Sequence, residues 1–251
     1  MTFIPTNPDE TRNYGPDVSF YQDDNGTPQG IDFVKMKARG AKFVYIRAGQ
    51  NTWKDPDFET NVTAARAADL PWGPYWYLDV RSSMAAQAKI FGDLCTLWKP
   101  DLLPVVDYEQ ATAYTINGVL TNLKLSDLIL FIVNFTNFFK MNKKMMIYTG
   151  YWYWRERGST NVTWKEYPLW LAQYRLGEPD TPTPWPTYKL WQFTPSGPGI
   201  SFGVESNAID LNYLNGDLPW IVDPIDIPPV PDSTITGIRI YYSDDSYKNI
   251  K

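Results

Sequence analysis

Two carboxylates, Asp107 and Glu109, close the run "LLPVVDYEQ" at residues 102–110. The apolar residues before them are typical of a buried strand, and such a strand does not normally end on two like charges. Residues two apart in a strand point to the same side, so the two carboxylates are predicted to face one way and Tyr108 the other. Two neighbouring acids can divide proton donation and charge stabilisation between them, as glycoside hydrolysis requires.

Two further acids stand in similar settings, Asp17 after "NYGP" and Asp210 after "NAI". Each is predicted to lie at the carboxyl end of a strand, the first and the last strand of the chain. Clustered carboxylates raise one another's pKa, so at least one of the four is predicted to stay protonated near neutral pH and to act as a general acid. Taken singly, an Asp at a strand end is more often a helix N-cap or a turn residue.

The composition narrows the chemistry that these acids could perform. The 251 residues contain no histidine and a single cysteine, Cys95. This excludes Ser-His-Asp and Cys-His catalysis, His-ligated zinc sites and an intrachain disulfide. A hard cation bound by carboxylates is a rival interpretation, but a dense metal site usually brings more acids on one loop. We therefore predict no metal and no cofactor.

Charge and hydropathy exclude several classes of partner. The net charge is −5, with no long Lys/Arg run of the kind that binds nucleic acid or anionic membranes. No stretch approaches the roughly 20 apolar residues of a membrane span. The N-terminal residues lack the basic and apolar regions of a signal peptide. We predict no nucleic-acid partner, no membrane insertion, and either a cytoplasmic location or release by a route that the sequence does not encode.

Alternating strand-like and helix-like segments predict the elements that position the acids. Eight strands in about 200 residues predict an α/β fold, a single (β/α)-type barrel of parallel strands with its site at their carboxyl ends and few helices in the final third. Asp55 and Ser126 are predicted to cap the second and the last helix. The strands are expected at 14–22, 43–49, 72–78, 102–109, 144–150, 168–174, 188–194 and 207–214, and the helices at 31–40, 55–70, 82–98 and 124–140.

The chain is predicted to have four parts. Residues 1–13 form an N-terminal extension and residues 14–221 the catalytic barrel. Residues 222–233, "VDPIDIPPVPDS", read as a stiff Pro-rich linker. Residues 234–251 alternate like one or two strands and form either a short β-like tail or the beginning of a further module.

At this point the ordered motifs resemble those of the glycoside hydrolase family 25 muramidases, the lysozymes common in bacteriophage and bacteria. The resemblance covers about residues 14–217. It is carried by "GPDVSFYQ", "IDFVKMKARGAKFVYIRAG", "DPDFETNVTAARAADLPWGPYWYL", "PVVDYE", "IYTGYWYW", "PLWLAQY", "LWQF" and "IDLNYLNGD".

The resemblance implies hydrolysis of the β-1,4 bond between N-acetylmuramic acid and N-acetylglucosamine in bacterial peptidoglycan. It implies that Glu109 is the general acid and that Asp107 supports the reacting sugar, by orienting its 2-acetamido group for substrate-assisted attack. Asp17 and Asp210 would complete the carboxylate cluster and tune its charge.

Aromatic residues make up 16% of the chain, and many lie beside Gly, Pro or polar residues. This suits sugar binding, because a pyranose has an apolar face that packs on aromatic rings, although a large aromatic core is the plainer interpretation. Trp76 stands where the family often has His and is expected to face away from the site. For the substrate-binding rim the resemblance indicates Tyr75, Tyr77, Tyr148, Gln173, Trp191 and Arg47.

Two other functions stay open on the sequence. One is a non-catalytic protein with the same barrel, either a cell-wall glycan-binding protein or a virion structural protein. The other is a glycosidase acting on chitin-like polymers. For a muramidase, the resemblance implies the host cytoplasm and then the cell wall after lysis, or the virion, with action outside the cytoplasm. The tail is expected to contact a wall-binding module or a virion protein.

Overall fold

The computed structural model describes residues 4–23, 30–221, 238–241 and 247–250. The chain divides into two compact units, residues 1–221 and 222–251. In the second unit β12 (Ile238–Tyr241) pairs with β13 (Tyr247–Ile250) in an antiparallel hairpin, so the strands predicted in the tail are confirmed. The predicted linker at 222–233 lies outside the described residues.

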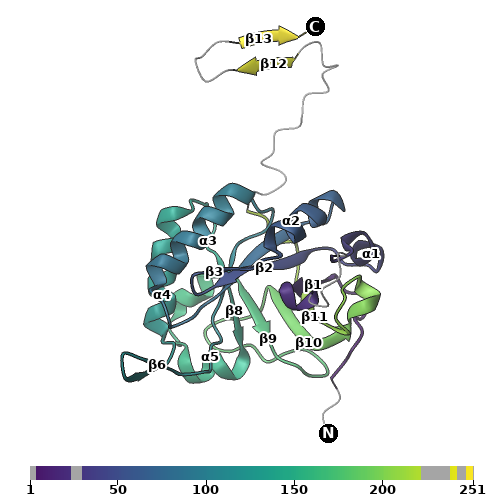
Figure 1. The fold of residues 1–251 in the computed structure, drawn as a ribbon. Helices are drawn as coiled ribbons and strands as arrows, with labels where there is room; N and C mark the ends of the chain where they lie inside the picture. Colours follow the sequence, from purple (N-terminus) through teal and green to yellow (C-terminus); the bar gives the residue numbers. More distant parts are fainter. Residues whose placement is uncertain (1–3, 24–29, 222–237, 242–246, 251) are drawn as a thin grey trace. The chain divides into compact units, whose positions relative to one another are not determined.

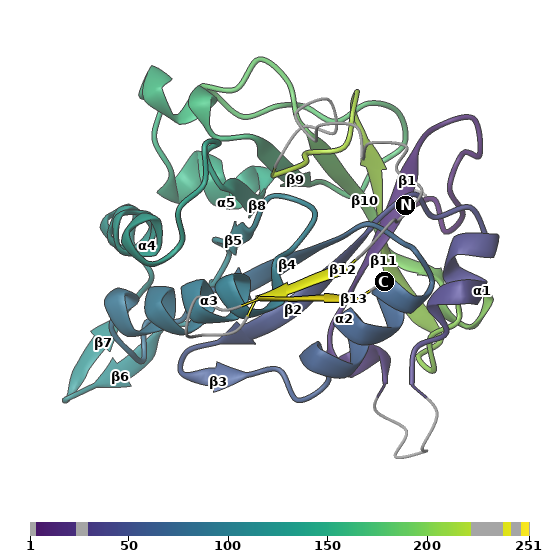
Figure 2. The same cartoon turned by 90° about the horizontal axis from the view of Figure 1, so that it is seen from above.

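Eight strands of the first unit close into a barrel (Figures 1 and 2). In ring order they are β1, β11, β10, β9, β8, β5, β4 and β2, and the pairing of β1 with β2 closes the ring. All eight predicted strands are confirmed. Their bounds are β1 (Tyr14–Val18), β2 (Val44–Gln50), β4 (Trp72–Tyr77), β5 (Val105–Asp107), β8 (Met146–Gly150), β9 (Leu169–Ala172), β10 (Leu190–Pro198) and β11 (Ala208–Leu214).

The expectation of parallel strands throughout is wrong for the last strand. β11 runs antiparallel to both of its neighbours, β10 and β1, while the other neighbouring pairs of the ring are parallel. The connection from β10 to β11 spans residues 199–207 and contains only the 3₁₀ turn η3 (Gly199–Phe202). A parallel neighbour needs a crossover of a dozen or more residues, so this short link returns the chain antiparallel.

Five α-helices are found in the described residues, and the four predicted ones are confirmed. The fifth helix, α5 (Tyr151–Arg157), was not predicted, because its sequence "YWYWRER" begins with four aromatic residues, which are more typical of a strand or of a sugar-binding rim. After α5 the described residues contain only 3₁₀ turns between strands, in line with the helix-poor final third. No described helix is long and apolar enough to cross a membrane. The helices are α1 (Phe33–Ala38), α2 (Phe58–Ala67), α3 (Met84–Trp98), α4 (Leu125–Phe138) and α5 (Tyr151–Arg157).

Both predicted helix caps are wrong. Asp55 instead accepts the backbone N–H groups of Asp57 and of Phe20 at 3.0 and 3.1 Å, so it ties two loops together and α2 begins three residues later. Ser126 lies inside the first turn of α4, where Asp127 accepts the backbone N–H of Lys124 at 2.8 Å. The N-cap residues are Asp57 for α2 and Lys124 for α4, each two residues away from the predicted one.

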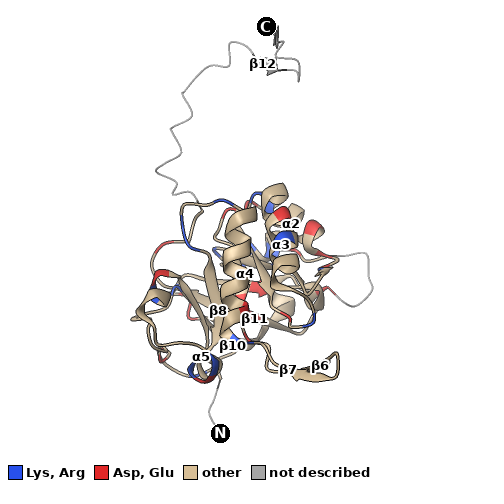
Figure 3. Ribbon diagram, turned by 90° about the vertical axis from the view of Figure 1, so that its left-hand side faces the viewer, with Lys and Arg blue, Asp and Glu red and all other residues tan. Residues whose placement is uncertain are grey.

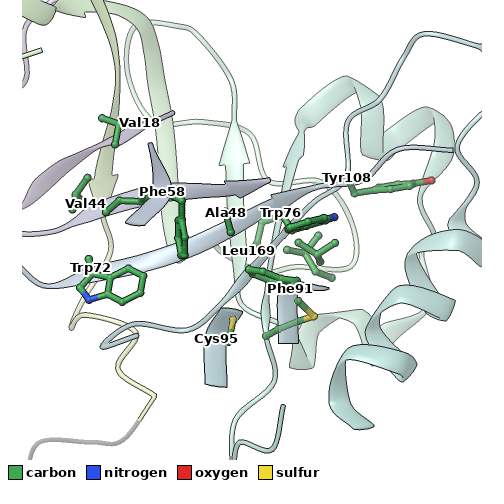
Figure 4. Close-up of a cluster of buried hydrophobic side chains, with 14 of the residues drawn as sticks. Val18, Val44, Ala48, Phe58, Trp72, Trp76, Phe91, Cys95, Tyr108 and Leu169 are labelled. Carbon is green, nitrogen blue, oxygen red and sulfur yellow. The ribbon is translucent and has the colours of Figure 1, made fainter. Parts of the chain in front are cut away.

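The strands alternate between two apolar layers. Tyr45 of β2, Val105 of β5 and Trp170 of β9 fill the inside of the barrel. Their neighbours point outward into a larger layer against the helices, where Trp76 and Tyr108 lie fully buried (Figure 4). The period of two therefore fixes which residues of each strand can reach the barrel mouth.

Smaller elements decorate the rim. β3 (Trp53–Lys54) pairs with the end of β2, and β6 (Tyr114–Ile116) pairs with β7 (Val119–Thr121) in a hairpin that projects from the barrel (Figures 2 and 3). Residues 4–13 contain no helix or strand and lie against β11, where the backbone N–H of Asp9 donates to the Tyr213 hydroxyl at 2.7 Å. Acidic and basic positions are mixed on the outer helices α2 and α3 (Figure 3).

Candidate active site

Four carboxylates converge at one end of the barrel. Asp17 lies on β1, Asp107 is the last residue of β5, Glu109 follows it by two residues, and Asp210 lies on β11. All four line a cavity of about 400 Å³ and a smaller inner hollow of about 80 Å³ behind it. Tyr108, between the two acids of β5, is buried on the outer side of the strand, as the period-two rule predicts.

Asp210 reaches this cavity by a route that differs from the predicted one. It is the third residue of β11, near the amino end of the strand rather than the carboxyl end. Because β11 runs antiparallel to β1, its amino end lies beside the carboxyl end of β1, and Asp210 pairs in register with Asp17. The predicted convergence therefore holds, but the predicted strand direction was wrong.

Burial raises the pKa of every member of the cluster. The pKa of Asp17 rises to about 6, and hydrogen bonds from Asn212 and Gln192 limit the rise. The pKa of Glu109 rises to about 7 through burial and then the charge of Asp17, while Tyr148 and Arg47 act in the opposite direction. Burial and the charges of Asp17 and Glu109 raise the pKa of Asp210 to about 8.

The pKa of Asp107 is also raised well above its usual range, by burial first and then by the charge of Glu109. A group of carboxyls with such values shares its protons near neutral pH, so it holds both a proton donor and a negative charge in one cavity. This is what acid-catalysed cleavage of a glycosidic bond needs.

Gln192 contacts two of the four acids, Asp17 and Asp210. Its Oε1 accepts hydrogen bonds from the hydroxyls of Tyr148 and Tyr174 at 2.9 and 2.8 Å. Its Nε2 donates to Asp17 Oδ2 at 3.0 Å and, more weakly, to Asp210 Oδ2 at 3.4 Å. The two phenols occupy the carbonyl oxygen, so the amide nitrogen is directed at the carboxylates.

Asn212 holds Asp17 from the other side. Its Nδ2 donates to Asp17 Oδ2 at 2.8 Å and to the backbone oxygen of Gly15 at 3.1 Å. Its Oδ1 accepts the indole N–H of Trp170 at 2.7 Å, and because an indole can only donate, this contact fixes the orientation of the amide. Asp17 thus receives two directed amide donors.

Two buried polar atoms in the cavity wall, Arg47 Nε and Asp107 Oδ1, make no hydrogen bond within the described part of the chain. The Arg47 guanidinium lies 6.0, 5.7 and 5.6 Å from the ring centroids of Phe20, Trp53 and Tyr77, and its Nη2 donates to Gln50. An unsatisfied buried polar group costs about 1–3 kcal/mol, so these two atoms are suited to contact a bound molecule.

Four of the six predicted rim residues line the cavities, namely Tyr75, Tyr77, Tyr148 and Arg47. Trp76 between the two tyrosines is buried on the outer side, where its Nε1 donates to Gln87 at 3.2 Å, as predicted.

Gln173 and Trp191 do not line either cavity. The Trp191 ring packs against Tyr213 on the outer side of β10, and its Nε1 donates to the backbone oxygen of Gln173 at 2.8 Å. The side chain of Gln173 accepts the backbone N–H of Asp180. Successive residues of a strand face opposite sides, so in β10 the residue that points into the barrel is Gln192, directly after Trp191. The prediction of Trp191 as a rim residue is therefore wrong by one residue.

The sequence contained a signal for the residues that were missed. Gln192 is a polar residue inside the apolar run "LWQF", and Asn212 follows Asp210 by two residues, which places both on the same face of β11. Among the residues that the structure describes, no group of three or more His, Cys, Asp or Glu side chains is arranged to bind a metal ion.

The sequence of this chain also matches known proteins. The profile of Glycosyl hydrolases family 25 matches residues 16–200. Lysozyme M1 of Streptomyces globisporus is 30% identical over 210 residues, which cover 80% of this chain and 67% of that protein. The autolytic lysozyme of Clostridium acetobutylicum is 25% identical over 204 residues, or 77% of this chain and 56% of that protein.

The fold is shared as well. The crystal structure of the bacterial lysozyme from Streptomyces coelicolor superposes with a TM-score of 0.67 at 24% identity, covering 83% of this chain and 94% of that one. The matched profile includes Asp17, Asp107 and Glu109 and ends before Asp210. The chain therefore belongs to family 25 of the glycosyl hydrolases and is a glycoside hydrolase.

Proposed function

We propose that this protein is an N-acetylmuramidase that cleaves the β-1,4 bond between N-acetylmuramic acid and N-acetylglucosamine in bacterial peptidoglycan. The observation that carries the proposal is the convergence of four carboxyls with raised pKa values in one cavity of a chain without histidine. The relatives named as lysozymes support the choice of polymer.

Glu109 acts as the general acid. Its pKa of about 7 keeps a large share of the side chain protonated at neutral pH, and it is more accessible than Asp107. As the bond between C1 and the bridging oxygen breaks, Glu109 passes its proton to that oxygen, which leaves with the departing sugar. The resulting carboxylate then accepts a proton from the water that completes the reaction.

Asp107 orients the 2-acetamido group of the reacting sugar. Its Oδ1, which has no partner among the described residues, accepts the acetamido N–H, and the acetamido carbonyl oxygen attacks C1 as the glycosidic bond breaks. Water then adds to C1 and the acetamido group is restored. Two successive inversions at C1 give net retention, so the first product should be the β-anomer.

Asp17 and Asp210 set the charge of the cluster. The charge of Asp17 raises the pKa of both Glu109 and Asp210, and Asp17 is itself held in place by Gln192 and Asn212. Burial and the charge of Asp17 therefore keep Glu109 a proton donor at higher pH than an isolated glutamate would be. The site of action that follows from this substrate is the bacterial cell wall, reached at phage lysis or from a virion.

The test is incubation of the wild type and of Glu109→Gln with purified peptidoglycan, followed by mass spectrometry of the soluble products. We expect disaccharide muropeptides with a reducing N-acetylmuramic acid end, and only from the wild type. Products from N-acetylglucosamine polymers but not from peptidoglycan would move the substrate to chitin-like glycans. A reducing N-acetylglucosamine end, or no product from either protein, would overturn the proposal.

A further inference from the structure

A second cavity lies outside the carboxylate site. Its volume is about 680 Å³, and it shares no lining residue with the two cavities that hold the acids. Its walls come from α5 and from the segments 158–160 and 181–183. Pockets that bind small molecules typically enclose about 300–1,000 Å³, so this one has room for a ligand of that class.

An indole ring forms the floor of this α5 cavity. Trp154 is buried, and its Nε1 donates to the backbone oxygens of Ser159 and Thr183 at 3.2 and 3.0 Å, which ties the two loop segments together. A Cβ at Gly158 would lie 2.3 Å from the Trp154 ring, so only glycine lets the chain pass this close to the indole. The shape of the cavity is therefore built into the fold.

Hydroxyl groups line the sides of the α5 cavity. Thr160, Thr181 and Thr183 all border it. A hydroxyl can both donate and accept, which matches the hydroxyls of a sugar. No carboxylate lies among the lining residues, so the cavity offers no opposite charge to the ammonium groups of a peptide.

An exposed aromatic and cationic edge borders the α5 cavity. Arg155 lines it and lies 5.6 Å from the ring centroid of Tyr151 and 5.0 Å from that of Trp152. The Trp152 side chain is 68% exposed, so much of the indole beside Arg155 is open to solvent. An indole face beside a planar donor suits a pyranose, which offers an apolar face and polar edges.

The helix that carries this edge is fixed to the catalytic strand. The Tyr153 hydroxyl donates to the backbone oxygen of Gln110 at 3.0 Å, directly after Glu109. The Tyr153 ring packs edge-on against Tyr108 with centroids 5.1 Å apart, and the Tyr108 hydroxyl donates to the backbone oxygen of Arg157 at 3.1 Å. α5 also begins directly after β8, which brings Tyr148 to the acids.

We propose that the α5 cavity is an accessory binding site for the amino-sugar glycan strand. A pyranose packs on Trp152, Arg155 donates to its polar edge, and the threonine hydroxyls bind the sugar that enters the cavity. This rests on the proposed function, since the ligand is another stretch of the same polymer. A polymer bound at two places on one rigid body dissociates more slowly than one bound in the catalytic cavity alone.

Binding without turnover tests the proposal. Glu109→Gln is combined with Trp152→Ala, Trp152→Phe or Arg155→Ala, and co-sedimentation gives the affinity for insoluble glycan strands from which an amidase has removed the stem peptides. We expect Trp152→Ala and Arg155→Ala to bind about fivefold to tenfold more weakly, and Trp152→Phe to recover most of the loss. Phe138→Ala is the matched control, an aromatic residue on α4 with 41% exposure, and it should bind like the parent.

Equal affinities for all these proteins would overturn the accessory site. A loss seen only with peptide-bearing peptidoglycan, and not with stripped glycan, would also overturn it and assign the cavity to the stem peptide. Thermal melts of each variant show whether the fold is intact. Hydrolysis by the wild type is scored separately, so failure of the proposed activity is distinguishable from failure of this site.

Discussion

The four carboxyls form two pairs that the protein holds in different ways. Asp17 and Asp210 face each other across β1 and β11 and share the amide nitrogen of Gln192. Asp107 and Glu109 leave β5 together, and Asp107 keeps one buried oxygen without a partner in the described residues. Protein hydrogen bonds thus fix the first pair, while the second pair is left with bonding capacity for substrate.

The pKa values of Asp17 and Asp210 also depend on how many hydrogen bonds each acid accepts from the protein. Asp17, with two amide donors, has a pKa of about 6, whereas Asp210, with one long contact, has a pKa of about 8. Hydrogen bonds to the charged form favour that form, so the better-bonded acid ionises first. The β1–β11 pair therefore supplies a fixed charge, and the β5 pair supplies the proton donor.

Removing the proton donor should have the largest effect. Glu109→Gln keeps the size of the side chain but cannot donate an acidic proton, so the rate of peptidoglycan hydrolysis should fall by roughly 10²–10⁴-fold. The measurement is the initial rate of release of reducing ends, with circular dichroism to verify the fold. Glu59→Gln, on the exposed face of α2, is the control and should retain the wild-type rate. Unchanged hydrolysis by Glu109→Gln would remove Glu109 from the mechanism.

Asp210→Asn should reduce activity less, by about tenfold, and should also stabilise the fold above pH 5. The folded-state pKa of about 8 lies above the unfolded value near 3.8, so the folded state retains a proton that the unfolded state has lost. This group therefore makes the free energy of unfolding fall as pH rises from about 4 to about 8. Because asparagine does not titrate, Asp210→Asn lacks this fall in the free energy of unfolding.

Thermal melts at pH 5 and pH 8 test the stability half of this prediction. The wild-type melting temperature should drop more between the two pH values than that of Asp210→Asn, and each kcal/mol of difference corresponds to about 2–4 °C for a domain of this size. A variant that melts below the wild type at pH 8 would show that Asp210 is held by an interaction stronger than its cost of burial.

Strand positions and the four acids could be predicted because both depend on local pattern. Apolar runs closed by Gly or by acids mark the strands, and the period of two correctly put Tyr75 and Tyr77 at the mouth and Trp76 behind it. The direction of β11 depends on the length of one connection and on ring closure, which no local pattern encodes. Gln192 stands out in the sequence as a polar residue in an apolar run, but its role depends on contacts with Asp17 and Tyr148, which lie far from it in sequence.

Removing the Gln192 amide donor from Asp17 should shift the pH profile. Wild-type activity should fall as pH rises through about 7, where Glu109 loses its proton. In Gln192→Met, Asp17 loses a donor and its pKa rises, so it carries less charge near Glu109. The pKa of Glu109 should then fall, and the alkaline limb of kcat/KM should move to lower pH.

Gln87→Met is the matched control for this shift, since Gln87 is also buried but bonds to the Trp76 indole and to the backbone of Asp79 and Ser82, and not to the four carboxyls. It should lower the melting temperature and leave the pH profile in place. An alkaline limb that stays where it is in Gln192→Met, or moves upward, would show that Gln192 does not couple Asp17 to Glu109.

The smallest effect is expected from deleting residues 224–251. The unit at 1–221 contains the closed barrel and every residue of the carboxylate cavity. The deletion also leaves in place the contacts that hold residues 220 and 221 against the rest of this unit. These are the bridge between Trp220 and Leu102, the contact of the Lys143 ammonium with the Trp220 carbonyl at 3.0 Å, and the hydrogen bond from Ile221 to Asp101. Hydrolysis of a soluble substrate should stay within about twofold of the full chain, since surface changes away from a site are usually nearly neutral. A shortened protein that fails to fold would show that the tail is part of the structure, whereas one that loses only activity on intact cell walls would assign the tail to targeting.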